Sequence, residues 1–196
     1  MAVGWWLSAE ARYTSTRARF RMPGQEFDLN PVTRLTTGAI GPPGQRVFYL
    51  QARAGDQLVT LVVEKIQVQS LAVGFEQFLV ELSRQYPDLS EASPAFDPGT
   101  MELEQPVDPA FRVGQIGLGY DQPTDRVVIV AREQLAEDSD PEQASVARLW
   151  CTRDQLRAMC QWGLEVASRG RPICGNCGEP MDPAGHFCPK SNGHKK

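Results

Sequence analysis

The chain ends in a segment with the spacing of a metal-binding module. Three of its five cysteines, Cys174, Cys177 and Cys188, and both of its histidines, His186 and His194, lie after residue 173. Their order is Cys-x2-Cys-x8-His-x-Cys, followed by His194. A Cys-x2-Cys turn directs two thiolates at one ion, and Zn²⁺ prefers four tetrahedral sulfur or nitrogen ligands. The spacing therefore predicts a Zn²⁺ site that determines how the end of the chain folds.

The three cysteines are the firm ligands of this prediction, and either histidine can supply the fourth. We favour His186 over His194, because a compact His-x-Cys half-site closes a shorter loop. Gly175 and Gly178 suit a turn around an ion, since glycine adopts positive φ without steric cost. A segment this short buries little apolar surface, so we expect metal binding to supply its folding free energy.

Two other types of Cys-x2-Cys site fit the sequence less well. A redox motif is expected to open a helix after a strand, whereas Cys174 follows a predicted helix and enters a Gly/Pro-rich tail. A deaminase zinc site carries His-x-Glu before Pro-Cys-x-x-Cys; here that order is reversed, and Ile173 separates Pro172 from Cys174. Four protein ligands leave no coordination position for water, so we predict a structural Zn²⁺.

The body of the chain, before this tail, lacks histidine throughout residues 1–170. This excludes Ser-His-Asp and Cys-His catalysis, an HExxH site and a histidine general base from the body. No stretch reaches the roughly 18 consecutive apolar residues of a membrane helix, so we expect no membrane contact. Five cysteines, with Cys-x2-Cys beside histidine, are more typical of a metal site in a reducing cytoplasm than of a secreted disulfide framework.

Hydrophobic patterning predicts strands and helices in alternation. A Gly55-Asp56 turn joins two β-rich runs, and Thr152 with Gln155 forms a capping box at the start of a helix that Gly170 closes. An earlier helix runs from about Val68 and should stop before Tyr86-Pro87, because the residue before proline avoids helical backbone angles. The strands are expected at residues 46–52, 57–64, 111–119, 126–132 and 145–151.

The two halves of the body resemble each other. The run Gly-Ala-Ile-Gly at 38–41 corresponds to Gly-Gln-Ile-Gly at 114–117. The apolar positions of the two helices also correspond, namely Leu71, Phe75 and Leu79 in the first and Leu156, Cys160 and Leu164 in the second. We predict an α+β fold: a duplicated β-β-β-α unit that forms a mostly antiparallel sheet with both helices on one face, plus a short C-terminal zinc-knuckle tail. Coincidence among common hairpins is the alternative.

Composition divides the chain into a leader, a body and a tail. The leader carries four arginines against one glutamate, and Met22 opens a better-patterned segment that could be the true start. The connector inside the body is acidic and rich in proline, with no lysine or arginine. The expected divisions are a flexible leader at 1–21, a body at 22–170 with halves at 33–86 and 111–170, the connector at 87–110, and the zinc-binding tail at 171–196.

Several separated motifs occur in order along residues 26–196. They are Thr37-Gly-Ala-Ile-Gly, Arg46-Val-Phe-Tyr-Leu-Gln51, Val63-Glu-Lys65, Phe111-Arg-Val-Gly-Gln-Ile-Gly-Leu118, and Cys174-Gly-Asn-Cys-Gly with Gly185-His-Phe-Cys-Pro189 and Asn192-Gly193. In these motifs the chain resembles an uncharacterised bacterial family, domain-of-unknown-function family 3090. The resemblance implies that the Cys-Cys-His-Cys tail is a shared module. It also favours His186, since members of that family often carry an aromatic residue at the position of His194. It implies no activity, and its gene neighbours, which resemble phosphatases and kinases, indicate a regulatory setting.

We therefore expect a non-catalytic cytoplasmic binding or adaptor protein, stabilised by zinc, whose partner is another protein. One alternative is an enzyme that uses carboxylate and lysine chemistry at Glu64 and Lys65, although a structural ion pair at this strand end is the simpler interpretation. Another is a nucleic-acid-binding zinc ribbon. The net charge of the chain is −4, of which the leader contributes +3, residues 22–170 contribute −9 and the tail contributes +2. With so small a positive charge, any contact of the tail with nucleic acid should be weak and salt-sensitive.

Overall fold

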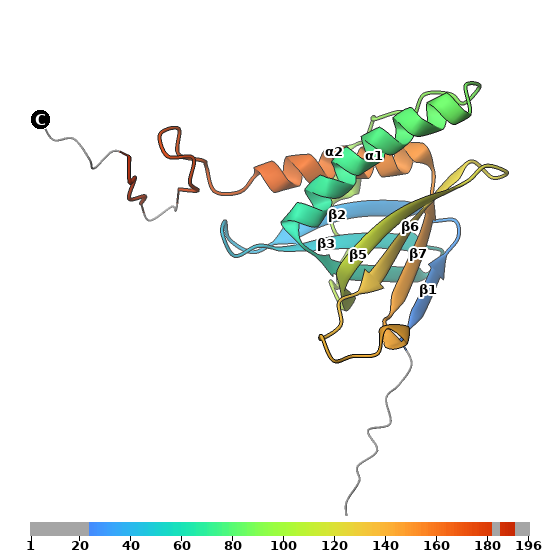
Figure 1. The fold of residues 1–196 in the computed structure, drawn as a ribbon, viewed down its shortest axis with the longest axis horizontal. Coiled ribbons are helices and arrows are strands. Elements are labelled where there is room, and N and C mark those ends of the chain that lie inside the picture. Colours follow the sequence, from blue (N-terminus) through green and yellow to red (C-terminus); the bar gives the residue numbers. More distant parts are fainter. Residues whose placement is uncertain (1–23, 182–184, 191–196) are drawn as a thin grey trace, which may run out of the picture.

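The computed structural model describes residues 24–181 and 185–190, so the predicted leader and Met22 lie outside the described residues. Within the described part, seven strands form one sheet in the order β1-β7-β6-β5-β4-β3-β2, and two long helices lie along one side of it (Figure 1). The elements are β1 (Glu26–Leu29), β2 (Arg34–Ile40), β3 (Val47–Ala54), β4 (Gln57–Val63), α1 (Lys65–Gln85), β5 (Pro109–Asp121), β6 (Arg126–Glu133), β7 (Val146–Cys151) and α2 (Arg153–Ser168), with short 3₁₀ helices η1 (Pro98–Met101) and η2 (Pro141–Gln143).

The sheet is mostly antiparallel, which confirms the predicted fold class. Among the described strands, β1 pairs in parallel with β7 and β4 with β5, while the other neighbours are antiparallel. Three strands followed by a helix occur twice, as β2-β3-β4-α1 and as β5-β6-β7-α2. This element order matches the prediction, but β1 has no counterpart in the second half, and the element order alone does not establish a duplication.

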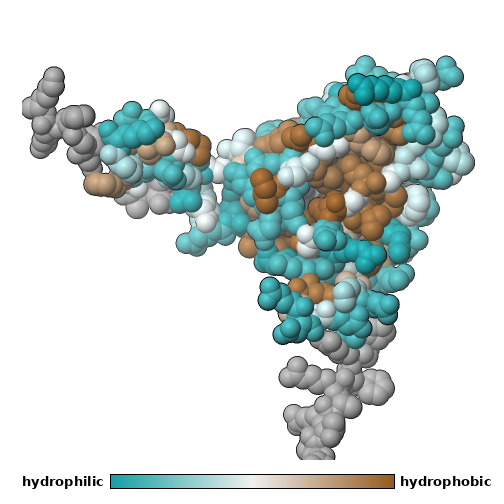
Figure 2. Space-filling view, viewed as in Figure 1, coloured by the Kyte–Doolittle hydropathy of each residue, from teal (hydrophilic) through white to brown (hydrophobic). Residues whose placement is uncertain are grey.

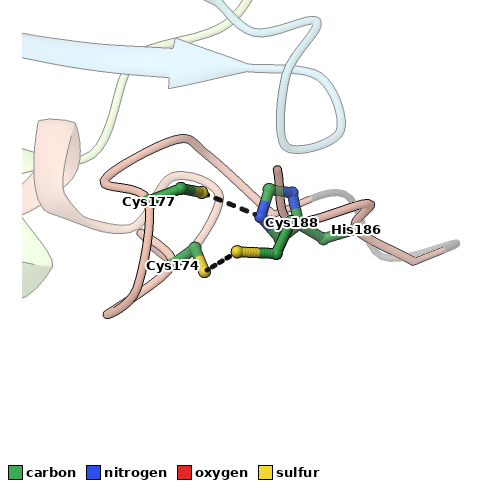
Figure 3. A group of neighbouring side chains, drawn as sticks. All are labelled: Cys174, Cys177, His186 and Cys188. Atoms are coloured by element: carbon green, nitrogen blue, oxygen red, sulfur yellow. Dashed lines mark hydrogen bonds between the residues drawn. The ribbon is translucent and has the colours of Figure 1, made fainter. Parts of the chain in front are cut away.

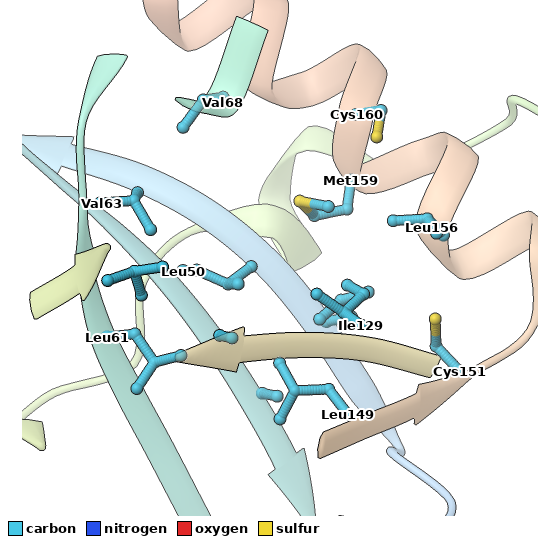
Figure 4. Packing of buried hydrophobic residues seen from close by; sticks show 14 of the residues in the cluster. Leu50, Leu61, Val63, Val68, Ile129, Leu149, Cys151, Leu156, Met159 and Cys160 are labelled. Atoms are coloured by element: carbon cyan, nitrogen blue, oxygen red, sulfur yellow. The ribbon is translucent and has the colours of Figure 1, made fainter. Parts of the chain in front are cut away.

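The core lies between the sheet and the helices (Figure 4). Met159 and Leu156 of α2 are buried to 2% and 0% exposure, and they pack with Ile129 of β6 and Leu61 of β4 in one cluster. Cys160 is also buried there, as its place on the apolar face of the helix predicts. Burial of apolar surface of this kind provides the main driving force for folding. No helix in the described residues is long and apolar enough to span a membrane.

The connector packs against the body along its length. Its Glu104 accepts hydrogen bonds from Arg53 and forms ion pairs with both Arg53 and Arg34 on neighbouring strands β3 and β2. The hydrogen bond from Arg53 lowers the pKa of the Glu104 carboxyl. Earlier in the connector, the ring of Phe96 meets Trp162 of α2 edge-on, with centroids 5.9 Å apart. The predicted acidic segment is therefore a docked part of the fold, with η1 as its regular element.

A nearly buried arginine joins three segments at the start of α2. Arg153 is 8% exposed, and its Nε and Nη2 donate to the two carboxylate oxygens of Asp125 at 2.8 and 2.9 Å. Its Nη1 donates to the carbonyl of Ser90 in the connector at 2.6 Å. Asp125 lies in the β5–β6 turn, and the hydrogen bonds from Arg153 lower its pKa. Asp125 also accepts the hydroxyl of Tyr120, whose pKa burial raises to about 12.

The predicted elements differ from the structure in several details. α1 begins at Lys65 rather than near Val68, because the backbone N–H of Glu64 donates to Oε1 of Gln67 at 2.8 Å and secures an earlier first turn. Leu164 is 44% exposed, so its place on the apolar face of α2 is wrong. Strand β1 was not expected at all. The end of α1 before Tyr86 and the capping box at the start of α2 are confirmed.

Candidate metal centre

The four predicted ligands come together after α2 (Figure 3). The ligand atoms of Cys174, Cys177, His186 and Cys188 all lie within 4.8 Å of one another. The Sγ atoms of Cys174 and Cys188 are 3.9 Å apart, and Sγ of Cys177 is 3.1 Å from Nε2 of His186. In the part of the chain that the structure describes, this is the one group of three or more Cys, His, Asp or Glu side chains that could hold a metal ion.

Backbone hydrogen bonds fold the Cys-x2-Cys segment into a tight turn. The N–H of Cys174 donates to the carbonyl of Glu179, and the N–H of Gly178 donates to the carbonyl of Cys174, both at 2.9 Å. Ile173 and Pro180 form an antiparallel bridge that closes the turn. Gly178 has a φ of +79°, an angle that a side chain would disfavour. The expected positive φ is thus confirmed at Gly178 but not at Gly175, which has an ordinary φ within the same turn.

Cys174 of the cluster differs chemically from the two cysteines of the core. Backbone N–H groups of Cys177 and Asn176 donate to the sulfur of Cys174 and lower its pKa to about 6, so it is a thiolate at neutral pH. The thiolate is the form that binds metal ions. By contrast, burial raises the pKa of Cys151 and of Cys160 to about 12, so both are neutral core thiols. Within the cluster, a backbone N–H of Glu179 donates to the sulfur of Cys177, but burial and the neighbouring Cys174 and Cys188 raise its pKa, so Cys174 is the cysteine whose thiolate is favoured. His194, the alternative ligand, lies outside the described residues.

The four clustered residues lie within the region that a sequence-family model matches. A family model described as a protein of unknown function (DUF3090) matches residues 27–188, which include all four clustered side chains. The chain belongs to the DUF3090 family. No curated protein and no solved structure matched it in the corresponding searches. The resemblance read from the separated motifs is thus confirmed, and the family description names no activity.

Glu64 and Lys65 of this DUF3090 protein lie at the junction of β4 and α1. Glu64 forms an ion pair with Arg112 on the neighbouring strand β5. Its ion-pair partner is therefore Arg112 rather than the adjacent Lys65. Both residues are exposed and line a cavity at this edge of the body. The ion pair of Glu64 thus links the β4–α1 junction to β5, while Lys65 lines the cavity without pairing with Glu64.

Sequence patterning did not reveal an apolar groove between α1 and β5. Leu71 and Phe78 of α1 face Ile116 and Leu118 of β5 across a cavity of about 430 Å³. All four side chains are only half-buried. Figure 2 shows the groove as an apolar patch beside α1. The helical periodicity placed Leu71 and Phe78 correctly on an apolar face, but it could not show that β5 leaves this face partly open to solvent.

Proposed function

We propose that this DUF3090 protein is a non-catalytic cytoplasmic binding or adaptor protein, in which a structural Zn²⁺ folds the tail and the body binds another protein. The observation that carries the zinc part is the convergence of three sulfurs and one nitrogen within 4.8 Å. Soft thiolate ligands with imidazole favour Zn²⁺ over hard cations such as Mg²⁺ and Ca²⁺. Among the described residues all five cysteines are free thiols, which fits a reducing compartment.

The spacing of the ligand atoms supports a tetrahedral ion. Two sulfur atoms each about 2.3 Å from a tetrahedral Zn²⁺ lie about 3.8 Å apart, and those of Cys174 and Cys188 are 3.9 Å apart. Sγ of Cys177 and Nε2 of His186 are 3.1 Å apart. The separation expected for one sulfur and one nitrogen ligand of Zn²⁺ is about 3.5 Å, so these two atoms would move apart by only a few tenths of an ångström. All four coordination positions are then filled by protein, as in structural rather than catalytic zinc sites.

The metal would act as the core of the tail. Among the residues described after α2, Ile173 and Phe187 are 61% and 76% exposed, so their side chains add little apolar burial. Without the ion, no positive charge would offset the negative charge of cysteine thiolates held close together in the cluster. Metal binding energy thus becomes folding energy for this segment, while the body retains its own core.

Zinc content and local folding test this part of the proposal. Native mass spectrometry of the reduced protein should show one Zn²⁺ per chain, and Cys174→Ser should lose it because the remaining ligands cannot complete a tetrahedral site. Cys160→Ala, a core cysteine outside the cluster, is the matched control and should keep the ion. Chelation should collapse the dispersed amide resonances of residues 173–181 and leave those of the sheet in place. The proposal would be overturned if reduced protein prepared with zinc in excess contained no bound zinc.

The partner part is supported by the groove between α1 and β5. Contiguous apolar surface that remains exposed on a folded chain is typical of protein interaction sites, and here Ile116 and Leu118 face Leu71 and Phe78 across an open space. An apolar segment of a partner protein, such as one face of a helix, would cover these side chains. The charge distribution agrees with a protein partner, since residues 22–170 carry a net charge of −9 and would repel a nucleic acid.

A charged substitution in the groove tests this assignment. Ile116→Glu places a carboxylate among the apolar walls and should abolish recovery of the partner in a pull-down from source cells. Ile40→Glu, at a 45% exposed isoleucine at the end of β2, is the matched control and should leave recovery unchanged. Circular dichroism of both variants checks that the fold is intact. Recovery of the same proteins by the wild type and by Ile116→Glu would refute a partner in this groove.

A further inference from the structure

A basic cavity lies where β3, β4, α1 and the segment after α2 meet. Its volume is about 500 Å³, within the range of small-molecule sites. Four cationic side chains and one acidic side chain line it: Arg46, Lys65, Arg112, Arg171 and Glu64. This composition is unusual for the molecule, because residues 22–170 as a whole are strongly acidic.

The one acidic side chain that lines the cavity is already paired. Glu64 forms its ion pair with Arg112, which leaves Arg46 and Lys65 without neutralisation by that carboxylate. Neither Arg46 nor Lys65 has an ion-pair partner among the residues that the structure describes. Lys65 is also the first residue of the 21-residue helix α1, where the helix dipole adds positive potential.

Arg46 is held in place by contacts that involve no carboxylate. Its Nη1 donates to the backbone carbonyl of Val166 near the end of α2, at 3.1 Å. Its guanidinium lies over the ring of Phe48, 5.4 Å from the centroid. These contacts orient the side chain, and an oriented guanidinium can donate two parallel hydrogen bonds to a phosphate or carboxylate.

Gly170 brings the two cations to one space. A Cβ atom built on Gly170 would lie 3.1 Å from Nη2 of Arg46 and 3.6 Å from Nζ of Lys65. The two positive groups therefore face the same point beside a residue that has no side chain. The carbonyl oxygen of Ala167 lies 3.6 Å from the same point, so an anion would bind on the cavity side of the two cations, where it would contact both and relieve the repulsion between them.

We propose that this cavity binds a small phosphorylated organic molecule, with its phosphate or diphosphate between Arg46 and Lys65. Phe48, Val47 and Val63 also line the cavity and supply an apolar wall for the organic part. This site is distinct from the proposed zinc site and from the proposed protein-binding groove, and it does not depend on which protein binds in that groove. Its few cations and its limited volume favour a small ligand over a nucleic acid, which needs a longer track of phosphate contacts.

Titration calorimetry with inorganic pyrophosphate, on zinc-loaded protein at constant ionic strength, tests the site. The wild type should bind in a one-to-one ratio, and Arg46→Gln and Lys65→Gln should each weaken binding at least tenfold. Arg84→Gln removes the same charge from an exposed pair on α1, 74% exposed at the arginine, and should leave binding unchanged. Chloride at matched ionic strength should not compete.

Three results would overturn the proposal. The first is that the wild type does not bind pyrophosphate. The second is that all three variants weaken binding equally, which would indicate a general charge effect. The third is that a single-stranded RNA binds more tightly and displaces pyrophosphate, which would indicate a nucleic-acid surface. Zinc content and melting temperature are measured on every sample. A negative result with one Zn²⁺ per chain thus rejects the anion site alone, and the zinc proposal stands or falls on its own measurement.

Discussion

Replacing Arg153 by methionine should destabilise the body and change how its stability responds to acid. The variant keeps an apolar stem but loses two hydrogen bonds to Asp125 and one to the carbonyl of Ser90. Hydrogen bonds to charged groups contribute about 1.5–3 kcal/mol each when buried. Because Asp125 is 48% exposed, solvent screening reduces that contribution. We expect a total loss of about 2 kcal/mol at pH 7, which corresponds to a melting temperature lower by roughly 4–8 °C for a chain of this size.

The pH dependence provides a second check on the same pair. The pKa of Asp125 is lowered in the folded protein, chiefly by its hydrogen bonds from Arg153. A lowered pKa stabilises the fold above the ordinary carboxyl value of about 4, and the contribution is lost as pH falls through the folded value. The stability difference between wild type and Arg153→Met should therefore be largest near neutral pH and narrow towards pH 3.

Urea unfolding followed by circular dichroism at pH 7 and at pH 3 measures both effects. Arg84→Met, which breaks an exposed ion pair with Glu81, is the control and should cost less than about 0.5 kcal/mol. A difference between wild type and Arg153→Met that stays constant across this pH range would show that the carboxylate is not the relevant partner. A loss below about 0.5 kcal/mol at pH 7 would show that the three segments are joined by other contacts.

Two further substitutions test packing and capping in thermal melts. Gly163→Ala places a Cβ 2.7 Å from Cγ1 of Val68 and 2.9 Å from Cγ2 of Thr37, so it should cost about 1–3 kcal/mol, whereas Gly74→Ala, with open space around its Cβ, should be neutral or stabilising. An unchanged melting temperature for Gly163→Ala would contradict the close approach of α1, α2 and β2. Thr152→Ala removes the side-chain cap of α2 and should cost about 1 kcal/mol, and an equal melting temperature would show that the cap is dispensable.

The candidate metal centre could be predicted from sequence because its ligands are close in the chain. Cys174 and Cys188 are separated by 14 positions, so spacing alone constrains their geometry. The same holds for the start of α2, where Thr152 and Gln155 are three residues apart and cap each other's backbone. Local chemistry of this type is independent of how the rest of the chain is arranged.

The remaining features depend on contacts between distant residues. Arg46 and Lys65 converge on Gly170, which lies more than one hundred positions away in the sequence. The groove requires α1 to lie beside β5, and no periodicity within either element reports that contact. Leu164 fits the helical apolar pattern, yet it is 44% exposed, because neither the sheet nor α1 covers that part of α2. Patterning identifies which faces are apolar, and tertiary packing decides which of them are covered.

The parallel pairing of β1 with β7 also determines when the sheet can be completed. Glu26 lies opposite Val146, and Leu29 lies opposite Leu149. During synthesis, β1 therefore leaves the ribosome long before its partner exists, and its backbone groups stay without that partner until β7 has been made. Closing so long a loop slows this step relative to the local hairpins β2–β3–β4. The strand that is made first is thus the last to pair, and a nascent chain that stalls before residue 146 leaves β1 without β7 to hydrogen-bond with.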